Sequence, residues 1–195
     1  MTPTAMMMIV NSLDDIARGL LDPAEAIARP VSGKTDAAVL VPLFEGPRGP
    51  TCVFTERRHD LRTHPGEISF PGGRRDPGEE LVATALREAE EEIGLEPGEV
   101  TVVGALAPAT SFVTRYRIYP FVARIERPDA WRPSPTEVAE VLEFPLDELV
   151  ANYRRERLWS KRVPIRTPTF RVDGHLVWGA TALLTEQLLR RIGVI

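Results

Sequence analysis

The chain has 195 residues, a formal net charge of −4 at pH 7 and 43% hydrophobic residues. This length suits one domain with short additions, and the slightly acidic balance argues against nucleic acid or a lipid surface as the partner. No apolar stretch approaches the length of a membrane span. The single cysteine, Cys52, excludes an internal disulfide and fits a reducing compartment, so we expect a cytoplasmic protein.

The order of the expected elements favours a mixed fold. In chain order they are one or two short helices within 11–28, strands at 37–44, 51–57 and 67–70, a helix at 77–93, strands at 100–108 and 117–125, a strand and a short helix within 138–152, and an amphipathic helix near the end. Strands and helices do not alternate regularly, which indicates an α+β fold rather than a doubly wound sheet. We expect helical extensions at 1–34 and 151–195, packed on a central domain at 35–150.

The helix expected at 77–93 carries four carboxylates in five positions, at Glu88, Glu90, Glu91 and Glu92. Like charges three or four residues apart on a helix repel by roughly 0.2–0.5 kcal/mol per pair. Glu88, Glu91 and Glu92 share one face at this spacing, whereas Glu90 points elsewhere. Two explanations remain open at this point, namely a solvated acidic flank and a site for a hard divalent cation.

The residues upstream of this helix favour the cation. Mg²⁺ and Mn²⁺ prefer carboxylate oxygens and take further ligands from water and phosphate. Gly72 and Gly73 allow close approach of the backbone, so the Gly73 carbonyl can face the same ions as the glutamates. The sequence therefore predicts a Mg²⁺ or Mn²⁺ site.

The spacing of these residues is distinctive. From Gly73, five residues lead to Glu79 and seven more lead to Arg87 and Glu88, before Glu91, Glu92, Gly94 and Leu95. This order resembles the Nudix box, G-x5-E-x7-R-E-U-x-E-E-x-G-U, in which U is apolar. The resemblance implies a Nudix-type mixed β-sheet sandwiched between helices, and hydrolysis of a nucleoside diphosphate linked to another moiety. It also implies that Glu88, Glu91, Glu92 and the Gly73 carbonyl bind the metal, with Glu79 and the catalytic-site residue Arg87 supporting them.

A second motif lies immediately upstream. Residues 53–73 resemble the motif of coenzyme A pyrophosphatases, L-L-T-x-T-[SA]-x3-R-x3-G-x3-F-P-G-G. The residues in register are Thr55, Arg62, Gly66, Phe70, Pro71, Gly72 and Gly73. Val53 and Phe54 replace the two leucines, Arg57 stands at the threonine position, and Arg58 replaces a small residue. The resemblance implies coenzyme A as substrate, with 3',5'-ADP and 4'-phosphopantetheine as products.

Three residues of this motif are candidates for substrate binding. The guanidinium groups of Arg57 and Arg62 can each donate two hydrogen bonds to phosphate oxygens. Gly72 has no side chain, so its backbone can approach the phosphate. The arginines can equally pair with the acidic helix or face water, and this alternative is favoured for Arg58.

The general base remains open between two residues. Glu137 follows a Pro-rich loop and is a candidate that could swing over the metals, while Glu91 is the alternative within the box. Glu140 is a weaker candidate, and Glu137 can also simply begin a strand. A set of aromatic residues offers an adenine or pantetheine pocket, although core packing explains them equally well: Phe112, Tyr116 and Tyr119.

Two other functions remain possible from the sequence. One is a Nudix hydrolase for another substrate, such as ADP-ribose, NADH or a dinucleotide. The other is a silent Nudix domain that senses a nucleotide, which the intact glutamates of the box argue against. We expect a small-molecule substrate, with no nucleic acid or membrane partner, and leave open whether the chain is a monomer or a homodimer.

Overall fold

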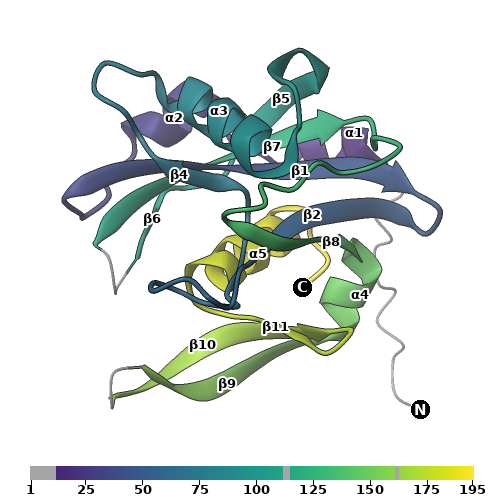
Figure 1. Ribbon diagram of the computed structural model, residues 1–195. Helices are drawn as coiled ribbons and strands as arrows, with labels where there is room; N and C mark the ends of the chain where they lie inside the picture. Colours follow the sequence, from purple (N-terminus) through teal and green to yellow (C-terminus); the bar gives the residue numbers. More distant parts are fainter. Residues whose placement is uncertain (1–11, 112–114, 161–162) are drawn as a thin grey trace.

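The computed structural model describes residues 12–111, 115–160 and 163–195 (Figure 1). The helices are α1 (Leu13–Arg18), α2 (Pro23–Ala28), α3 (Leu81–Ile93), the 3₁₀ turn η1 (Pro97–Glu99), α4 (Leu146–Ala151) and α5 (Gly179–Arg191). The strands are β1 (Thr35–Gly46), β2 (Gly49–Arg57), β3 (Ile68–Ser69), β4 (Gly72–Arg74), β5 (Val100–Ala105), β6 (Ala109–Thr110), β7 (Tyr116–Ile125), β8 (Val138–Pro145), β9 (Tyr153–Ser160), β10 (Val163–Val172) and β11 (His175–Val177). Within these residues, no helix is long and apolar enough to cross a membrane.

The main sheet is mixed, as predicted. Its central order is β3-β2-β1-β7-β5, with β4 paired to β1, β6 to β7 and β8 to β2. The pairing of β1 with β7 is parallel, and the other pairings are antiparallel. Both faces of β1 are covered, since Leu40 belongs to one buried cluster and Val41 to the other. This explains why the run at 37–44 is continuously apolar instead of alternating.

Helices cover the two faces of this sheet (Figure 1). On one face α2 and α3 pack through Ala26, Ala85 and Ala89 against the side of β1 that carries Leu40. On the other face α4 and α5 pack with Val41 of β1. The predicted sandwich of a mixed sheet between helices is therefore confirmed.

The C-terminal region differs from the helical extension expected at 151–195. It contains α5, but also a small antiparallel sheet of order β11-β10-β9 that the sequence analysis did not predict. Pro168 pairs with Arg155 in the middle strand, a position from which proline is normally excluded. The strand forms because Thr169, Phe170 and nearby apolar side chains are buried in the core. Burial of side chains here outweighs the local signals against a strand.

Candidate active site

Helix α3 presents its carboxylates through the regular spacing of its apolar residues. Leu81, Ala85, Ala89 and Ile93 recur every four residues and are all buried against the sheet. Glu88 and Glu92 directly precede Ala89 and Ile93, so their side chains lie along one flank of this apolar face. The helix ends at Gly94, whose φ of 71° is the left-handed conformation that glycine adopts easily.

The helix begins later than the sequence predicted, at Leu81 rather than at 77. Gly78 has a φ of 81°, which interrupts a right-handed helix. Asp76 does not cap α3 and instead forms a turn in which the Glu79 N–H donates to its carbonyl at 3.1 Å. This turn frees Glu79 to point back toward the helix.

Strand β4 brings the two glycines against the helix. The Gly72 N–H donates to Oε2 of Glu92 at 3.3 Å, and Gly73 pairs with Ala38 of β1. A Cβ atom on residue 73 would lie 2.5 Å from the carboxylate carbon and both oxygens of Glu88. A side chain at residue 73 would therefore force the Glu88 carboxylate out of this position.

Arg87 connects the acidic residues of the box. Its Nε and Nη2 donate to the two oxygens of Glu79 at 2.9 and 3.2 Å, which is a forked pair. Its Nη1 donates to Glu88 at 3.0 Å and to Glu91 at 3.3 Å. Hydrogen bonds from Arg87 and Thr84 lower the pKa of Glu79 to about 2, so Glu79 is an ionised anchor for the arginine.

Glu92 is a buried carboxylate with few interactions that offset the cost of burying its charge. It is only 9% exposed, and among the described residues no cationic side chain pairs with it. Burial, together with the charge of Glu88, raises the pKa of Glu92 to about 8. Burial also raises the pKa of Glu88, despite its contact with Arg87. Two adjacent carboxylates with raised pKa values favour the binding of a proton or a cation.

The donor set fits Mg²⁺ or Mn²⁺, which bind hard oxygen ligands. The carboxylates do not yet converge, however: across the part of the chain that is described, no group of three or more His, Cys, Asp or Glu side chains forms a ready-made ion site. Glu91 is turned outward, with 60% of its side chain exposed, in contact with Arg87. Arg87 thus holds the carboxylate that would complete the set.

The Pro-rich loop is fixed to the end of α3. The N–H of Ser134 donates to the carbonyl of Glu92 at 2.8 Å, and that of Arg132 to the carbonyl of Ile93 at 3.2 Å. The N–H of Glu137 in turn donates to the carbonyl of Ser134 at 3.2 Å. These bonds place Glu137, directly before β8, near enough for its charge to raise the pKa of both Glu88 and Glu92. The loop is anchored by these bonds, in contrast to the swinging loop considered from the sequence.

Two arginines of the second motif, Arg57 and Arg58, make contacts within the protein. Arg57 lies 3.6 Å from Oε2 of Glu137 and donates from Nε to the carbonyl of Thr63. Arg58 forks onto Asp60 at 2.9 and 2.8 Å and donates to the carbonyl of Pro135 at 2.7 Å.

Arg58 therefore joins two loops, which gives a structural reason for the bulky residue at that position. Arg62 is exposed and has no ion-pair partner within the described residues. Of the three arginines, Arg57 is the one that reaches the carboxylate site.

The remaining candidates lie outside the carboxylate cluster. Glu140 lies opposite Glu56 in the backbone pairing of β8 with β2, and its side chain is exposed. Tyr119 packs against the core beneath α3, and Tyr116 is half-buried at the start of β7. Phe112 lies outside the described residues. The sequence analysis did not find the contribution of Ser134 and Thr84, which act through hydrogen bonds that no spacing rule predicts.

The arrangement agrees with comparisons to known proteins. Residues 34–165 match the family described as NUDIX domain. The chain belongs to the Nudix family. It is 40% identical to a relative from Pectobacterium atrosepticum over 84% of this chain and 86% of the relative, and 36% identical to one from Escherichia coli O1:K1 over 86% and 88%. Both relatives are named "Uncharacterized Nudix hydrolase NudL", which gives a reaction class but no substrate.

Solved Nudix structures share the fold. A Nudix hydrolase from M. smegmatis, RenU, is similar with a TM-score of 0.51 and 21% identity, covering 68% of this chain and 81% of that one. A C. elegans Ap4A hydrolase in a binary complex has a TM-score of 0.50 and 20% identity, covering 60% and 85%. Family membership supports a Nudix hydrolase acting on nucleoside diphosphate derivatives.

Proposed function

We propose that this Nudix hydrolase cleaves the diphosphate of coenzyme A, or of its oxidised or acyl forms. The products would be 3',5'-ADP and 4'-phosphopantetheine or its acyl derivative. The observation that carries the proposal is that residues 53–73, which resemble the coenzyme A pyrophosphatase motif, share one site with α3. The Gly72 N–H of that stretch donates to Glu92, and Arg57 lies 3.6 Å from Glu137.

Glu88, Glu91, Glu92 and the carbonyl of Gly73 would hold Mg²⁺ or Mn²⁺. Bound ions of this kind neutralise the charge of a diphosphate and lower the pKa of the attacking water. Glu91 pairs with Arg87 and is exposed, so its share in ion binding requires another side-chain rotamer.

The side chains of the protein would contribute orientation and proton transfer. Arg87, held by Glu79, balances part of the negative charge and orients Glu88. Glu137 is our leading candidate for the general base that accepts a proton from water, with Glu91 as the alternative. The guanidinium of Arg57, 3.6 Å from Oε2 of Glu137, would help to hold that carboxylate in position.

Two arginines are our candidates for contacts with the phosphate oxygens. Arg57 is near the carboxylates, and Arg62 is exposed on the adjoining loop without a competing ion pair within the described residues. Guanidinium groups can donate two parallel hydrogen bonds to a phosphate, which suits this role. Gly72 is half-buried, with its backbone packed against Ala38 and Val39 of β1, and is the weaker candidate for a contact with the substrate.

The test is a substrate panel with the purified full chain and Mg²⁺ or Mn²⁺. The panel contains coenzyme A, dephospho-coenzyme A, ADP-ribose, NADH and diadenosine polyphosphates, and the products are identified by mass. We expect kcat/KM to be highest for coenzyme A or one of its derivatives, with 3',5'-ADP as product. The Glu88→Gln variant, which keeps the shape of the side chain, serves as the inactive control for contaminating hydrolases.

The panel also distinguishes the two alternative functions, a Nudix hydrolase for another substrate and a nucleotide-sensing domain. A kcat/KM for ADP-ribose, NADH or a dinucleotide about tenfold above that for coenzyme A would replace the proposed substrate. Binding of nucleotides without turnover of any of them, in the presence of either metal, would indicate a sensing domain instead.

A further inference from the structure

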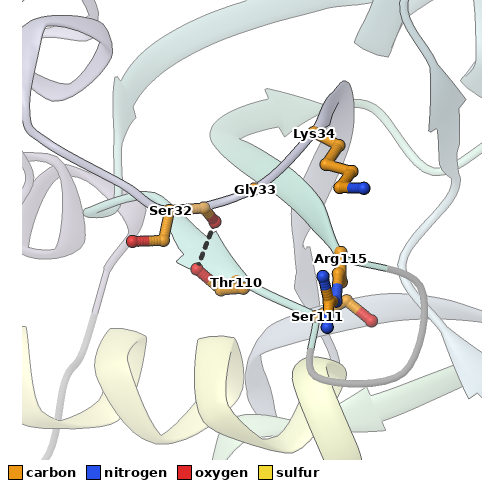
Figure 2. Close-up of a pocket in the computed structure, with 6 residues that line it drawn as sticks. All are labelled: Ser32, Gly33, Lys34, Thr110, Ser111 and Arg115. Carbon is orange, nitrogen blue, oxygen red and sulfur yellow. Dashed lines mark hydrogen bonds between the residues drawn. The ribbon is translucent and has the colours of Figure 1, made fainter.

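A pocket at the start of β1 lies apart from the carboxylates. Its cavity volume is about 450 Å³, and it is lined by Ser32, Gly33, Lys34, Thr110, Ser111 and Arg115 (Figure 2). The linker before β1 supplies one wall, and β6 with the start of β7 supplies the other. The hydroxyl of Thr110 donates to the carbonyl of Ser32 at 2.6 Å and so holds the two walls together.

The pocket carries two cations whose charges are not balanced. Over the described residues, neither Lys34 nor Arg115 forms an ion pair with a carboxylate, and both are exposed. The neighbouring acid, Asp36, is already occupied, because Arg117 donates to it at 2.6 Å and Arg75 lies 3.5 Å away. The pocket therefore has an excess of positive charge in a protein whose net charge is −4.

The backbone holds Arg115 in an uncommon conformation. Its φ is 57°, in the left-handed region that residues other than glycine rarely adopt. Two hydrogen bonds of 2.8 Å maintain it, from the N–H of Lys34 to the carbonyl of Arg115 and from the N–H of Arg115 to the carbonyl of Ser111. In Figure 2, Lys34 and Arg115 both lie across the pocket from Ser32, with Lys34 at the upper end and Arg115 lower down beside Ser111.

We propose that this pocket binds a phosphate monoester of the substrate, separate from the diphosphate that is cleaved. A guanidinium and an ammonium group that line the same pocket suit a phosphate dianion better than a neutral group. Lys34 directly precedes β1, and the Ala38 partner of Gly73 lies four residues along, about 13 Å at the rise of a strand. The long side chains of Lys34 and Arg115 can cover part of that distance, so one extended substrate can contact both sites.

For coenzyme A, the monoester would be its 3'-phosphate, so this inference rests on the proposed function for the identity of the ligand. The test compares coenzyme A with dephospho-coenzyme A, which lacks that phosphate. The variant Lys34→Ala/Arg115→Asn removes both charges, and asparagine is chosen because it tolerates a positive φ. The control Arg18→Ala/Arg29→Ala removes the same charge from exposed arginines of the N-terminal region.

We expect the pocket variant to raise KM for coenzyme A about tenfold, with KM for dephospho-coenzyme A within about twofold and kcat unchanged for both. The arginine control should change neither KM value. Equal effects on the two substrates, or no effect on either, would overturn the proposal. If Arg62→Ala alone changes the preference between the two substrates, the 3'-phosphate is bound by the loop of residue 62 and the pocket is not its site.

A binding experiment without metal keeps the two proposals separate. In the presence of a chelator, the wild-type protein should bind 3',5'-ADP more tightly than 5'-AMP by calorimetry, and the pocket variant should lose that difference. If coenzyme A is not hydrolysed but this difference is found, the proposed function fails and the phosphate pocket stands. If coenzyme A is hydrolysed and the difference is absent, the pocket proposal fails alone.

Discussion

Gly73 and Glu88 are in such close contact that no side chain fits between them. A Cβ atom on residue 73 would lie 2.5 Å from the carboxylate carbon and both oxygens of Glu88. The contact joins β4, which is fixed by its pairing with β1, to the middle of α3. The position of the Glu88 carboxylate is thus set by a backbone segment rather than by a side-chain partner alone.

Replacing Gly73 with alanine should displace this carboxylate. We expect Gly73→Ala to lower kcat by about 100-fold, because small misplacements of groups at a reacting centre have effects of this size. The free energy of unfolding should change little, because the group that must move is the free end of a flexible side chain. Kinetics with the substrate identified by the panel and urea unfolding measure the two effects.

Gly98→Ala is the matched control, because a Cβ there meets nothing within 4 Å. If Gly73→Ala has the kinetics of the wild type, the carboxylate of Glu88 is not held in place by this contact.

Glu92 should couple metal binding to stability. A ligand at about 100 times its Kd stabilises the folded protein by about 2.7 kcal/mol, which corresponds to an increase in Tm of roughly 5–10 °C for a chain of this size. We expect Mn²⁺ to raise Tm of the wild type in this way, and to have little effect on Glu92→Gln. Thermal unfolding with chelator and with Mn²⁺ is the measurement.

Glu90→Gln is the control for this experiment, since Glu90 is exposed on the same helix. Equal stabilisation of the wild type and Glu92→Gln by Mn²⁺ would remove Glu92 from the metal site.

Glu137 should be required for proton transfer. Glu137→Gln keeps the size of the side chain and its backbone bond to Ser134, but cannot accept a proton. We expect kcat to fall more than tenfold, a barrier increase above about 1.4 kcal/mol. Glu140→Gln, an exposed change three residues along, should leave kcat unchanged. A loss below tenfold for Glu137→Gln would leave Glu91 as the candidate base.

Glu79 should contribute stability that is lost in acid. Its pKa is lowered from 4.5 to about 2 by Arg87, so its ionised form is favoured in the folded protein. Its stabilising effect is full above about pH 4.5 and disappears as pH falls toward about 2. The Glu79→Gln variant should lack about 1–2 kcal/mol of this stability at neutral pH and show a flatter decline in acid.

Urea unfolding across the acidic range measures the free energy of unfolding for both proteins. Glu80→Gln is the control. Glu80 is the residue next to Glu79, and its side chain makes no capping hydrogen bond to α3. Parallel pH profiles for the wild type and Glu79→Gln would show that the ion pair with Arg87 adds no net stability.

The sequence by itself determined the parts of this protein that depend on local spacing. The four-residue repeat of apolar side chains on α3 fixes which glutamates share a flank, and the run at 37–44 marks a strand that is buried on both faces. The order of glycine, arginine and glutamate residues pointed to the Nudix family before any contact was known. These features need only the periodicity of helices and strands.

Only the tertiary structure decided how distant segments meet. The loop bond from Ser134 to the carbonyl of Glu92 brings Glu137 to the site, and Arg58 is tied to Pro135 rather than to a phosphate. Strands β9–β11 form despite the proline at 168, because burial in the core outweighs local preference. The pocket of Lys34 and Arg115 likewise arises from residues about 80 positions apart, whose proximity follows from the parallel pairing of β1 with β7.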